Sequence, residues 1–436
     1  MTSARRLQSG GLVDRSRRIR FKFNGRDYFG HPGDTLASAL LAQGVRLFGR
    51  SFKYHRRRGV VGAGAEEPNA LVQVGEGAYS TPNLKATQVE LYDGLTARTV
   101  NGWPSLAFDI GAINNRLSRL LPAGFYYKTF MWPKSAWMRY EHHIRHAAGL
   151  GRTPSLPDPD QYDKRHAHCD VLVVGAGPTG LIAALGAARS GARVMMVDEQ
   201  SQLGGSLLSA PAVIGGQAGL DWAGEVEAEL RALPEVTILS RSTVTGYYDH
   251  NFLSVNERRT DHLGPAQSDT PGSRERLWRI RAKQVVLATG AIERPLVFDG
   301  NDTPGVMLAS AVSTYIHRYA VAPGRSGVVF TNNDSGYQAA IDMSNAGMEV
   351  RAVVDVRMTA GADVAKTVAD MGIPVYLGYV VPSVQSGLQG LKRIEMAKLS
   401  ADGRAILSHK GLVDCQVLAV SGGWSPVVHL HSQSGG

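Results

Sequence analysis

Residues 170–198 read DVLVVGAGPTGLIAALGAARSGARVMMVD, and this stretch decides the fold class. The apolar run Asp170–Val174 predicts a short buried strand, and Leu181–Ser190 shows the apolar spacing of a helix. A second apolar strand, Arg193–Val197, ends at Asp198. Strand, glycine turn, helix and strand in this order predict a βαβ unit of a parallel α/β sheet.

Three glycines follow the first strand in the pattern G-x-G-x-x-G. Gly175 permits the tight turn, Gly177 lets a pyrophosphate approach the backbone, and Gly180 lets the helix pack closely on the strand. The helix would direct free N–H groups and its positive dipole end at the phosphates. A purely structural turn is the alternative, but strand, helix and second strand in register favour a dinucleotide site.

The acid after the second strand, Asp198, lies 18 residues beyond Gly180. A carboxylate at this position accepts hydrogen bonds from ribose hydroxyls. NADP carries a phosphate on that ribose and needs a positive partner there. An acid rather than an arginine therefore favours NAD or FAD.

Further small-residue segments extend this candidate site. The loop at Gly204 and Gly205 can run beside the ribose and phosphates, and the strand Gln284–Leu287 leads into an Ala-Thr-Gly turn. In two-dinucleotide oxidoreductases such a turn brings backbone against the same cofactor. The predicted cofactor-binding residues are Gly175, Ala176, Gly177, Pro178, Thr179, Gly180, Asp198, Glu199, Gly204, Gly205, Ala288, Thr289, Gly290 and Gly423.

A second, weaker unit begins at Gly327. Val328–Thr331 predicts a strand, but the loop Thr331–Gly336 keeps only the third glycine of the fingerprint. The next strand, Glu349–Val354, still ends in an acid, Asp355. Side chains would meet a pyrophosphate where two glycines are missing, so we favour a structural Rossmann unit over a second working site.

The N-terminal region, here called the front of the chain, predicts a β-grasp fold. Ile19–Phe23 and Arg26–Phe29 flank Asn24-Gly25, which suits a two-residue hairpin turn. Leu36–Gln43 predicts a helix that Gly44 ends. The expected fold class is α/β, with a ferredoxin-like β-grasp domain followed by a two-dinucleotide-binding-domain (Rossmann-like) oxidoreductase fold.

Four segments follow from these signals. They are a cysteine-free β-grasp over 1–95, a linker and helical segment over 96–165, a first dinucleotide domain over 166–300 and 412–436, and an inserted degenerate Rossmann domain over 301–411. The second segment carries histidines at helical spacing, for which an interface or surface role is favoured over a metal site. They are His142, His143 and His146.

Positive charge is concentrated at the front. The chain has a net charge of +9, and its first sixty residues hold 14 basic and 3 acidic residues, a balance of +11. No nucleic-acid module surrounds this region, so a solvated or subunit-facing patch is favoured over nucleic-acid binding.

The uncharged run Val171–Ala188 is too rich in glycine for a membrane span, and no secretory signal is evident. We expect no nucleic-acid or membrane partner.

The chain has two cysteines, Cys169 and Cys415. This number excludes a disulfide framework, a Cys-rich zinc site and the redox pair of a thiol-disulfide reductase. It also predicts no iron-sulfur cluster, because such a cluster takes four thiolates. A cytoplasmic location is the default for such a chain.

In this order, the motifs resemble the N-terminal half of the α subunit of heterotetrameric sarcosine oxidase, over nearly the whole chain. Related amine and opine dehydrogenase subunits share single motifs, whereas the combination with a cysteine-free front is specific. The matching segments are Gly33–Leu40, Ser51–Arg56, Glu66–Leu71, the Gly175 fingerprint, Ala288–Pro295, Gly300–Asp302, Pro304–Met307 and Ser421–Trp424.

The resemblance implies a site on this chain that holds NAD noncovalently, with FAD as the alternative. It also implies β, γ and δ subunits, oxidation of sarcosine at FAD on the β subunit, and FMN where α and β meet. Relatives can carry a [2Fe-2S] cluster in the front domain, but the loop Arg58–Glu67 offers Gly, Val, Ala and Glu where thiolates are needed. A folate-binding, aminomethyltransferase-like domain would follow in a full α subunit, so the chain is interpreted as partial or shortened.

No catalytic residue is predicted, because no nucleophile-base set or paired carboxylates stand out. The favoured function is a sarcosine oxidase subunit that binds a dinucleotide, in a complex whose substrate is a small amine. An FAD-binding subunit of an amine or opine dehydrogenase is the first alternative, and a noncatalytic assembly scaffold is the second.

Overall fold

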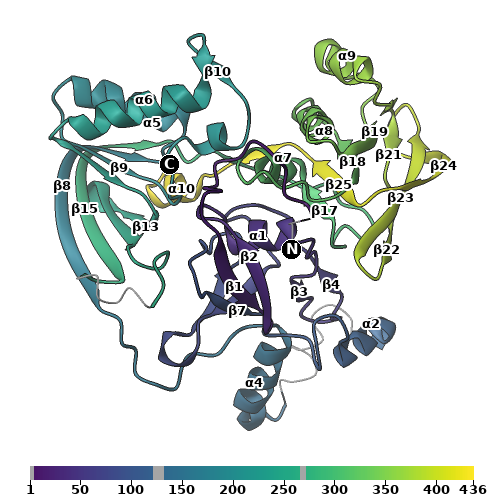
Figure 1. Ribbon diagram of the computed structural model, residues 1–436, viewed down its shortest axis with the longest axis horizontal. Coiled ribbons are helices and arrows are strands. Elements are labelled where there is room, and N and C mark those ends of the chain that lie inside the picture. The colour runs from purple at the N-terminus through teal and green to yellow at the C-terminus, as the bar shows by residue number, and fades with distance from the viewer. Residues whose placement is uncertain (1–3, 121–131, 266–271) are drawn as a thin grey trace. The chain divides into compact units, whose positions relative to one another are not determined.

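A six-stranded sheet carries the glycine loop (Figure 1). The computed structural model describes residues 4–120, 132–265 and 272–436. Four neighbouring strands are parallel and the last two are antiparallel. In sheet order the strands are β12 (Val236–Leu239), β9 (Val194–Val197), β8 (Tyr162–Val174), β15 (Glu275–Leu287), β14 (Phe252–Arg258) and β13 (Ser242–Tyr248).

Two helices cover this sheet, α5 (Pro178–Arg189) and α6 (Gly219–Ala232). Buried side chains of α5, including Leu181 and Leu185, pack with Val173, Met196 and Leu230 in one apolar core. The helix α5 begins at Pro178, three residues earlier than the apolar spacing indicated. Pro178 lacks an N–H and suits the first turn of a helix, where that group has no intrahelical partner.

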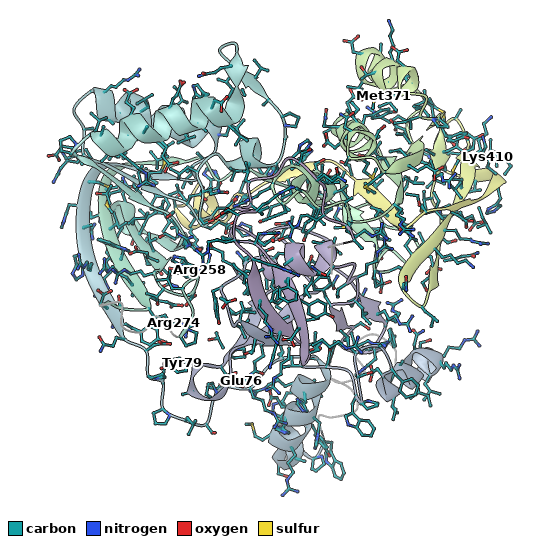
Figure 2. The ribbon with its side chains drawn as sticks, in the orientation of Figure 1. Glu76, Tyr79, Arg258, Arg274, Met371 and Lys410 are labelled. Atoms are coloured by element: carbon teal, nitrogen blue, oxygen red, sulfur yellow. The ribbon has the colours of Figure 1, made fainter. Side chains whose placement is uncertain are left out.

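The strands of this sheet extend further than their apolar runs. β8 begins at Tyr162, well before the predicted Asp170, and its polar half pairs with β15 from Glu275 onward. Ion pairs hold this half together: Arg276 donates to Asp163, and Arg274, which Figure 2 labels, donates to both Asp160 and Asp261. Pairing with a neighbour, rather than burial, therefore defines the strand there.

The chain divides into two compact units. The six-stranded sheet belongs to the unit formed by residues 159–293 and 424–436, which also contains the short pair β16 (Ala291–Glu293) and β26 (Trp424–Pro426). It ends with α10 (His429–Gln433). The other unit joins residues 1–158 to residues 294–423.

The front of this second unit is a five-stranded mixed sheet with a buried helix. Asn24 and Gly25 have positive φ angles, as the predicted hairpin turn requires. The helix α1 (Leu36–Ala42) is N-capped by Thr35, and all of its residues are buried. The strands in sheet order are β2 (Arg26–Gly30), β1 (Ile19–Phe23), β7 (Thr96–Arg98), β5 (Leu71–Val74) and β6 (Thr81–Lys85).

The same unit contains a parallel five-stranded sheet. Its strands in order are β17 (Val306–Leu308), β25 (Val417–Ser421), β18 (Ser326–Thr331), β19 (Glu349–Asp355) and β20 (Val375–Leu377). Its helices are α7 (Ala309–His317), α8 (Ser335–Asn345) and α9 (Ala362–Asp370). A smaller antiparallel sheet adjoins it, made of β21 (Tyr379–Val380), β23 (Gly390–Leu399), β22 (Val384–Gly387) and β24 (Ile406–Asp414).

β25 differs from its predicted place. The sequence prediction assigned residues 412–436 to the first dinucleotide domain, but β25 pairs in parallel with both β17 and β18 of the second sheet. Its five residues are all buried there. The residues after Gly423 join the first sheet's unit, so the chain changes units between Gly423 and Trp424.

A shared core joins the β-grasp to the second parallel sheet. Leu36 and Leu40 of α1 belong to the same apolar cluster as Tyr315 of α7 and Tyr337 of α8. The Tyr315 hydroxyl donates to the Gly62 carbonyl at 3.1 Å. The front is therefore packed as part of this unit rather than as an appended domain.

Glu67 organises the loop at this junction. Its fully buried carboxylate accepts four backbone N–H bonds: Oε2 from Val61 at 2.6 Å and Gly62 at 2.8 Å, and Oε1 from Asn69 at 2.6 Å and Ala70 at 3.2 Å. Burying a carboxylate is costly unless its oxygens are satisfied by such donors. The loop folds around this side chain.

Among the residues that the structure describes, no helix has both the length and the apolar character needed to cross a membrane.

Replacing Glu67 with Gln should lower the free energy of unfolding by about 2 kcal/mol, because the amide NH₂ would face backbone N–H groups and leave buried donors unpaired. Urea unfolding followed by circular dichroism measures this. The matched control is Glu66→Gln, since the half-buried Glu66 accepts from only Ala63 and Gly64 in this loop. Equal losses in the two variants would contradict the special position of Glu67.

Candidate dinucleotide site

Two of the three fingerprint glycines are required by the protein itself. Gly175 has a φ of +100° at the end of β8, and a Cβ there would lie well under 3.0 Å from the Ala288 carbonyl. A Cβ at Gly180 would come even closer to the Gly175 carbonyl oxygen. These positions need glycine because the turn, the helix and β15 meet at backbone distance.

Gly177 differs from both. It is the N-cap of α5, and a Cβ at this position would meet nothing nearer than the Gly205 Cα at 4.0 Å. No side chain caps the helix, and Pro178 occupies its first turn. Space beside an uncapped helix N-terminus is what a pyrophosphate requires, so the loop fits a dinucleotide.

Hydrogen bonds to three neighbouring segments hold the glycine loop in place. The Gly175 N–H donates to Val197 O at 2.8 Å, and the Gly204 N–H donates to Ala176 O at 2.9 Å. On the other side, the Ala288 N–H donates to Val174 O at 2.8 Å. The structure thus brings the Gly204-Gly205 loop and the Ala-Thr-Gly turn to the fingerprint, as the sequence indicated.

Asp198 has a role that the sequence did not reveal. Its half-buried carboxylate accepts from the Ala176 N–H at 2.6 Å and from the Gln200 N–H at 2.8 Å. The acid therefore ties the end of β9 to the glycine loop. Each carboxylate oxygen can accept more than one hydrogen bond, so these two bonds leave capacity for ribose hydroxyls. Ribose binding by Asp198 stays a prediction. The neighbouring Glu199 side chain is exposed, and the Glu199 backbone carbonyl accepts from Arg258, which Figure 2 labels.

The Ala288-Thr289-Gly290 turn depends on a residue that no motif identified. The Thr289 hydroxyl donates to Val427 O at 2.8 Å, and the Val427 N–H donates to Gly290 O at 3.0 Å. Val427 comes from the end of the chain, so only the folded structure places it here. Gly423, also a predicted cofactor residue, has a φ of +97° and accepts from Arg294, but it belongs to the other unit.

The corresponding loop of the second parallel sheet contains side chains that bond to one another. The Asn333 amide donates to Ser421 O and Oγ, and Thr331 Oγ1 donates to Asn333 O at 2.8 Å. Asp355, at the end of β19, accepts from Tyr337 and Arg357. These internal partners satisfy groups that would contact a dinucleotide in a working site, which supports the structural interpretation.

The two cysteines are poorly suited to redox chemistry. Both are buried, and burial raises the pKa of Cys169 to about 11 and that of Cys415 to about 12. Thiols with such pKa values stay protonated at neutral pH and are weak nucleophiles. Cys169 and Cys415 also lie in different units.

The sheets and the glycine loop define a dinucleotide-binding oxidoreductase fold. Comparison with known families makes this more specific: the chain belongs to the pyridine nucleotide-disulphide oxidoreductase family, whose model matches residues 169–435. The predicted fold class is confirmed by this match and by a solved structure, L-proline dehydrogenase from P. horikoshii. That structure aligns with a TM-score of 0.61 at 18% identity, covering 100% of this chain and 65% of that one.

The resemblance to sarcosine oxidase α subunits is also confirmed. The chain is 51% identical to the sarcosine oxidase subunit alpha of Rhizobium meliloti (strain 1021), over 100% of this chain and 42% of that protein. It is 40% identical to the subunit of the same name from Corynebacterium sp. (strain U-96), over 98% of this chain and 40% of that protein. The chain thus spans about two fifths of the length of these curated relatives.

One cofactor prediction was wrong. A model described as a 2Fe-2S iron-sulfur cluster binding domain matches residues 16–102, against the prediction of no iron-sulfur cluster. The front therefore belongs to a domain type described by cluster binding, which a count of cysteines did not reveal. The residues present do not fit a thiolate-held cluster, since this segment contains no cysteine.

The different surroundings of the glycines predict different effects of substitution. Gly177→Val should abolish dinucleotide retention and leave the fold intact, because its side chain would occupy only the pyrophosphate's approach. Gly180→Ala should instead lower the free energy of unfolding by about 3 kcal/mol, because it drives the helix off the turn. Cofactor released per chain and thermal unfolding measure the two effects. Unchanged cofactor content in Gly177→Val would contradict the site.

Asn333→Val tests the second loop. We expect cofactor content to stay at the wild-type level, because the loop is structural, while stability falls by about 1–3 kcal/mol as the bonds to Ser421 are lost. The same cofactor and unfolding measurements apply. Loss of the dinucleotide from a folded variant would move the site to this sheet.

Proposed function

We propose that this chain is the dinucleotide-holding part of the α subunit of a sarcosine oxidase complex. The observation that carries the proposal is the 51% identity over the full chain with a sarcosine oxidase α subunit. The intact Gly175 fingerprint supports it. The proposed reaction converts sarcosine, O₂ and tetrahydrofolate to glycine, H₂O₂ and methylenetetrahydrofolate.

The chain's own residues would position the dinucleotide. The N-terminus of α5 and the backbone at Gly177 face the pyrophosphate, and Asp198 accepts from ribose hydroxyls. NAD is the proposed occupant and FAD the alternative. A nicotinamide dinucleotide supplies hydride chemistry in general, but here it is proposed as a resident group, with the amine oxidised elsewhere in the complex.

The proposed partners are the β, γ and δ subunits, with FAD on β and FMN where α and β meet. The proposed location is the cytoplasm. Within the front of this chain, the division into a β-grasp over 1–95 and a helical segment over 96–165 also remains a proposal. No nucleophile paired with a base lies beside the glycine loop in the part of the chain that the structure describes, which supports placing the chemistry on a partner.

The identity of the bound dinucleotide separates the first two candidates. Mass spectrometry of the compound released from purified chain should detect NAD, and the protein should lack flavin absorbance. Stoichiometric FAD would instead favour an amine or opine dehydrogenase subunit. Absence of any dinucleotide would favour a noncatalytic scaffold.

This chain alone should not form peroxide from sarcosine and O₂, even when NAD, FAD and FMN are supplied. Its assembly with the other subunits should. The measurement is a coupled peroxide assay on the isolated chain and on the reconstituted complex, with each other subunit alone as the control. Turnover by the isolated chain would refute this division of labour.

A further inference from the structure

A short motif in the unit that contains the β-grasp exposes an unusual set of large apolar side chains. Over residues 103–117 five of them are 45–70% exposed: Trp103 70%, Phe108 69%, Ile110 52%, Ile113 58% and Leu117 45%. The last three lie three and four residues apart, across the turn Ile110–Ala112 and the helix α2 (Ile113–Arg116), and so share one side. Single exposed apolar residues are ordinary, whereas a set on one motif marks an interaction site.

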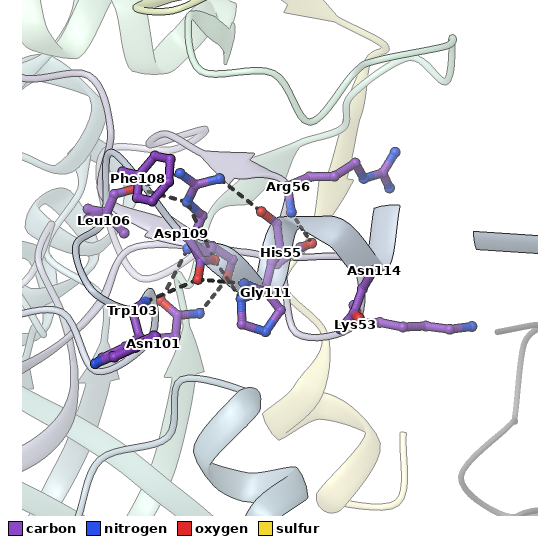
Figure 3. Close-up of polar contacts among 12 residues, drawn as sticks. Lys53, His55, Arg56, Asn101, Trp103, Leu106, Phe108, Asp109, Gly111 and Asn114 are labelled. Carbon is purple, nitrogen blue, oxygen red and sulfur yellow. Dashed lines mark hydrogen bonds and ion pairs between the residues drawn. The ribbon is translucent and has the colours of Figure 1, made fainter. Parts of the chain in front are cut away.

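Hydrogen bonds to the Asp109 carboxylate hold the motif in shape (Figure 3). The buried Asp109 carboxylate accepts from the Trp103 N–H at 3.0 Å and the Gly111 N–H at 3.1 Å, and it bonds to His55 Nδ1 at 2.6 Å. The His55 ring is itself only 12% exposed. These hydrogen bonds hold the apolar side chains in a fixed arrangement before a partner binds. Less conformational entropy is therefore lost on binding.

A second brace joins the motif to the neighbouring loop Ser51–Arg56. The Arg50 guanidinium donates to Leu106 O at 2.7 Å, to Ala107 O at 3.0 Å and to His55 O at 3.0 Å. Asn114 donates to Lys53 O. Lys53 and Arg56 extend away from the Asp109 cluster in Figure 3. These hydrogen bonds therefore join the apolar motif and this cationic loop into one continuous surface.

The charge of this surface is mainly positive. Asp109 is the single acid in residues 101–140, and its side chain is only 2% exposed. Arg116 and Arg119 are exposed at the end of the motif, and Arg56 is exposed on the loop, where it forms an ion pair with Asp302 at 3.1 Å. A partner that covers the apolar side chains must therefore offer carboxylates around an apolar centre.

We propose that residues 103–117 with the loop Ser51–Arg56 form the surface on which another subunit of the complex docks, through an apolar face rimmed by acidic side chains. This inference rests on the proposed function, which supplies the partner subunits. Trp, Phe and Arg are among the side chains that are enriched at protein interfaces. A lipid surface is disfavoured, because it is usually bound by a long amphipathic helix, and α2 has four residues.

The test compares the affinity of this chain for the purified assembly of the other subunits. The variants are Phe108→Glu/Ile113→Glu and, separately, Arg116→Glu. The control is Val297→Glu, which places the same charge at a 90% exposed valine outside the surface. Biolayer interferometry gives the rate and equilibrium constants. Circular dichroism and dinucleotide content show that each variant remains folded.

The double variant should bind at least about tenfold more weakly, a change of about 1.4 kcal/mol, while the control binds as the wild type does. Arg116→Glu should mainly slow association, and added salt should slow association of the wild type. Unchanged affinity in the double variant overturns the proposal, and so does failure of the wild-type chain to bind the assembly.

Two further experiments test whether a membrane or a second copy of this chain binds the surface instead. Wild-type binding to phosphatidylserine vesicles that the double variant loses would assign the surface to a membrane and overturn the proposal. Self-association of the isolated chain that the double variant loses would assign it to a second copy, with the same consequence. Peroxide formation by the reconstituted complex is measured separately. Loss of binding in the double variant, together with no sarcosine oxidation by the wild-type complex, would sustain the docking surface and refute the proposed function.

Discussion

The dinucleotide-binding unit depends on one steric constraint, the approach of helix α5 to the turn that precedes it. Because Gly175 and Gly180 have no side chains, the first turn of α5 packs directly on the Gly175 carbonyl, and the turn packs directly on Ala288, the residue after β15. The end of β9, Ala288 and the Gly204 loop then form hydrogen bonds with peptide groups of residues 174–176. This packing fixes the direction of the α5 N-terminus, while Gly177 keeps the space in front of it open.

Local signals in the sequence were sufficient for the elements whose shape is determined within a few residues. The Gly175 turn and the Asn24-Gly25 hairpin both need positive φ angles that glycine and asparagine adopt readily, so a short pattern identifies them. The polar half of β8 could not be predicted, because its residues become a strand only by pairing with β15, more than a hundred positions away. Val427 beside the Ala-Thr-Gly turn and β25 in the second sheet depend on equally distant contacts.

The candidate site shows the same division. The spacing of its glycines and the acid after β9 was visible in the sequence, since these positions belong to one βαβ unit. The bond between Asp198 and the Ala176 N–H was not, because a pattern shows that an acid is present but not which donor it faces. In the N-terminal region the domain type was inferred correctly. The prediction of no cluster relied on the number of cysteines and on the loop Arg58–Glu67, and it is contradicted by the domain model that matches residues 16–102.

Buried and half-buried carboxylates explain how this positively charged chain arranges its loops. Glu67 gathers four backbone N–H groups in the β-grasp, Asp198 fastens the glycine loop, and Asp109 supports the exposed motif over residues 103–117. Each acid stabilises irregular backbone, because its oxygens satisfy donors that no strand or helix pairs. An acid used in this way contributes little negative charge to the surface. The cations around the loop Ser51–Arg56 and α2 therefore dominate the field near the exposed motif, and that field would favour the approach of an acidic protein face.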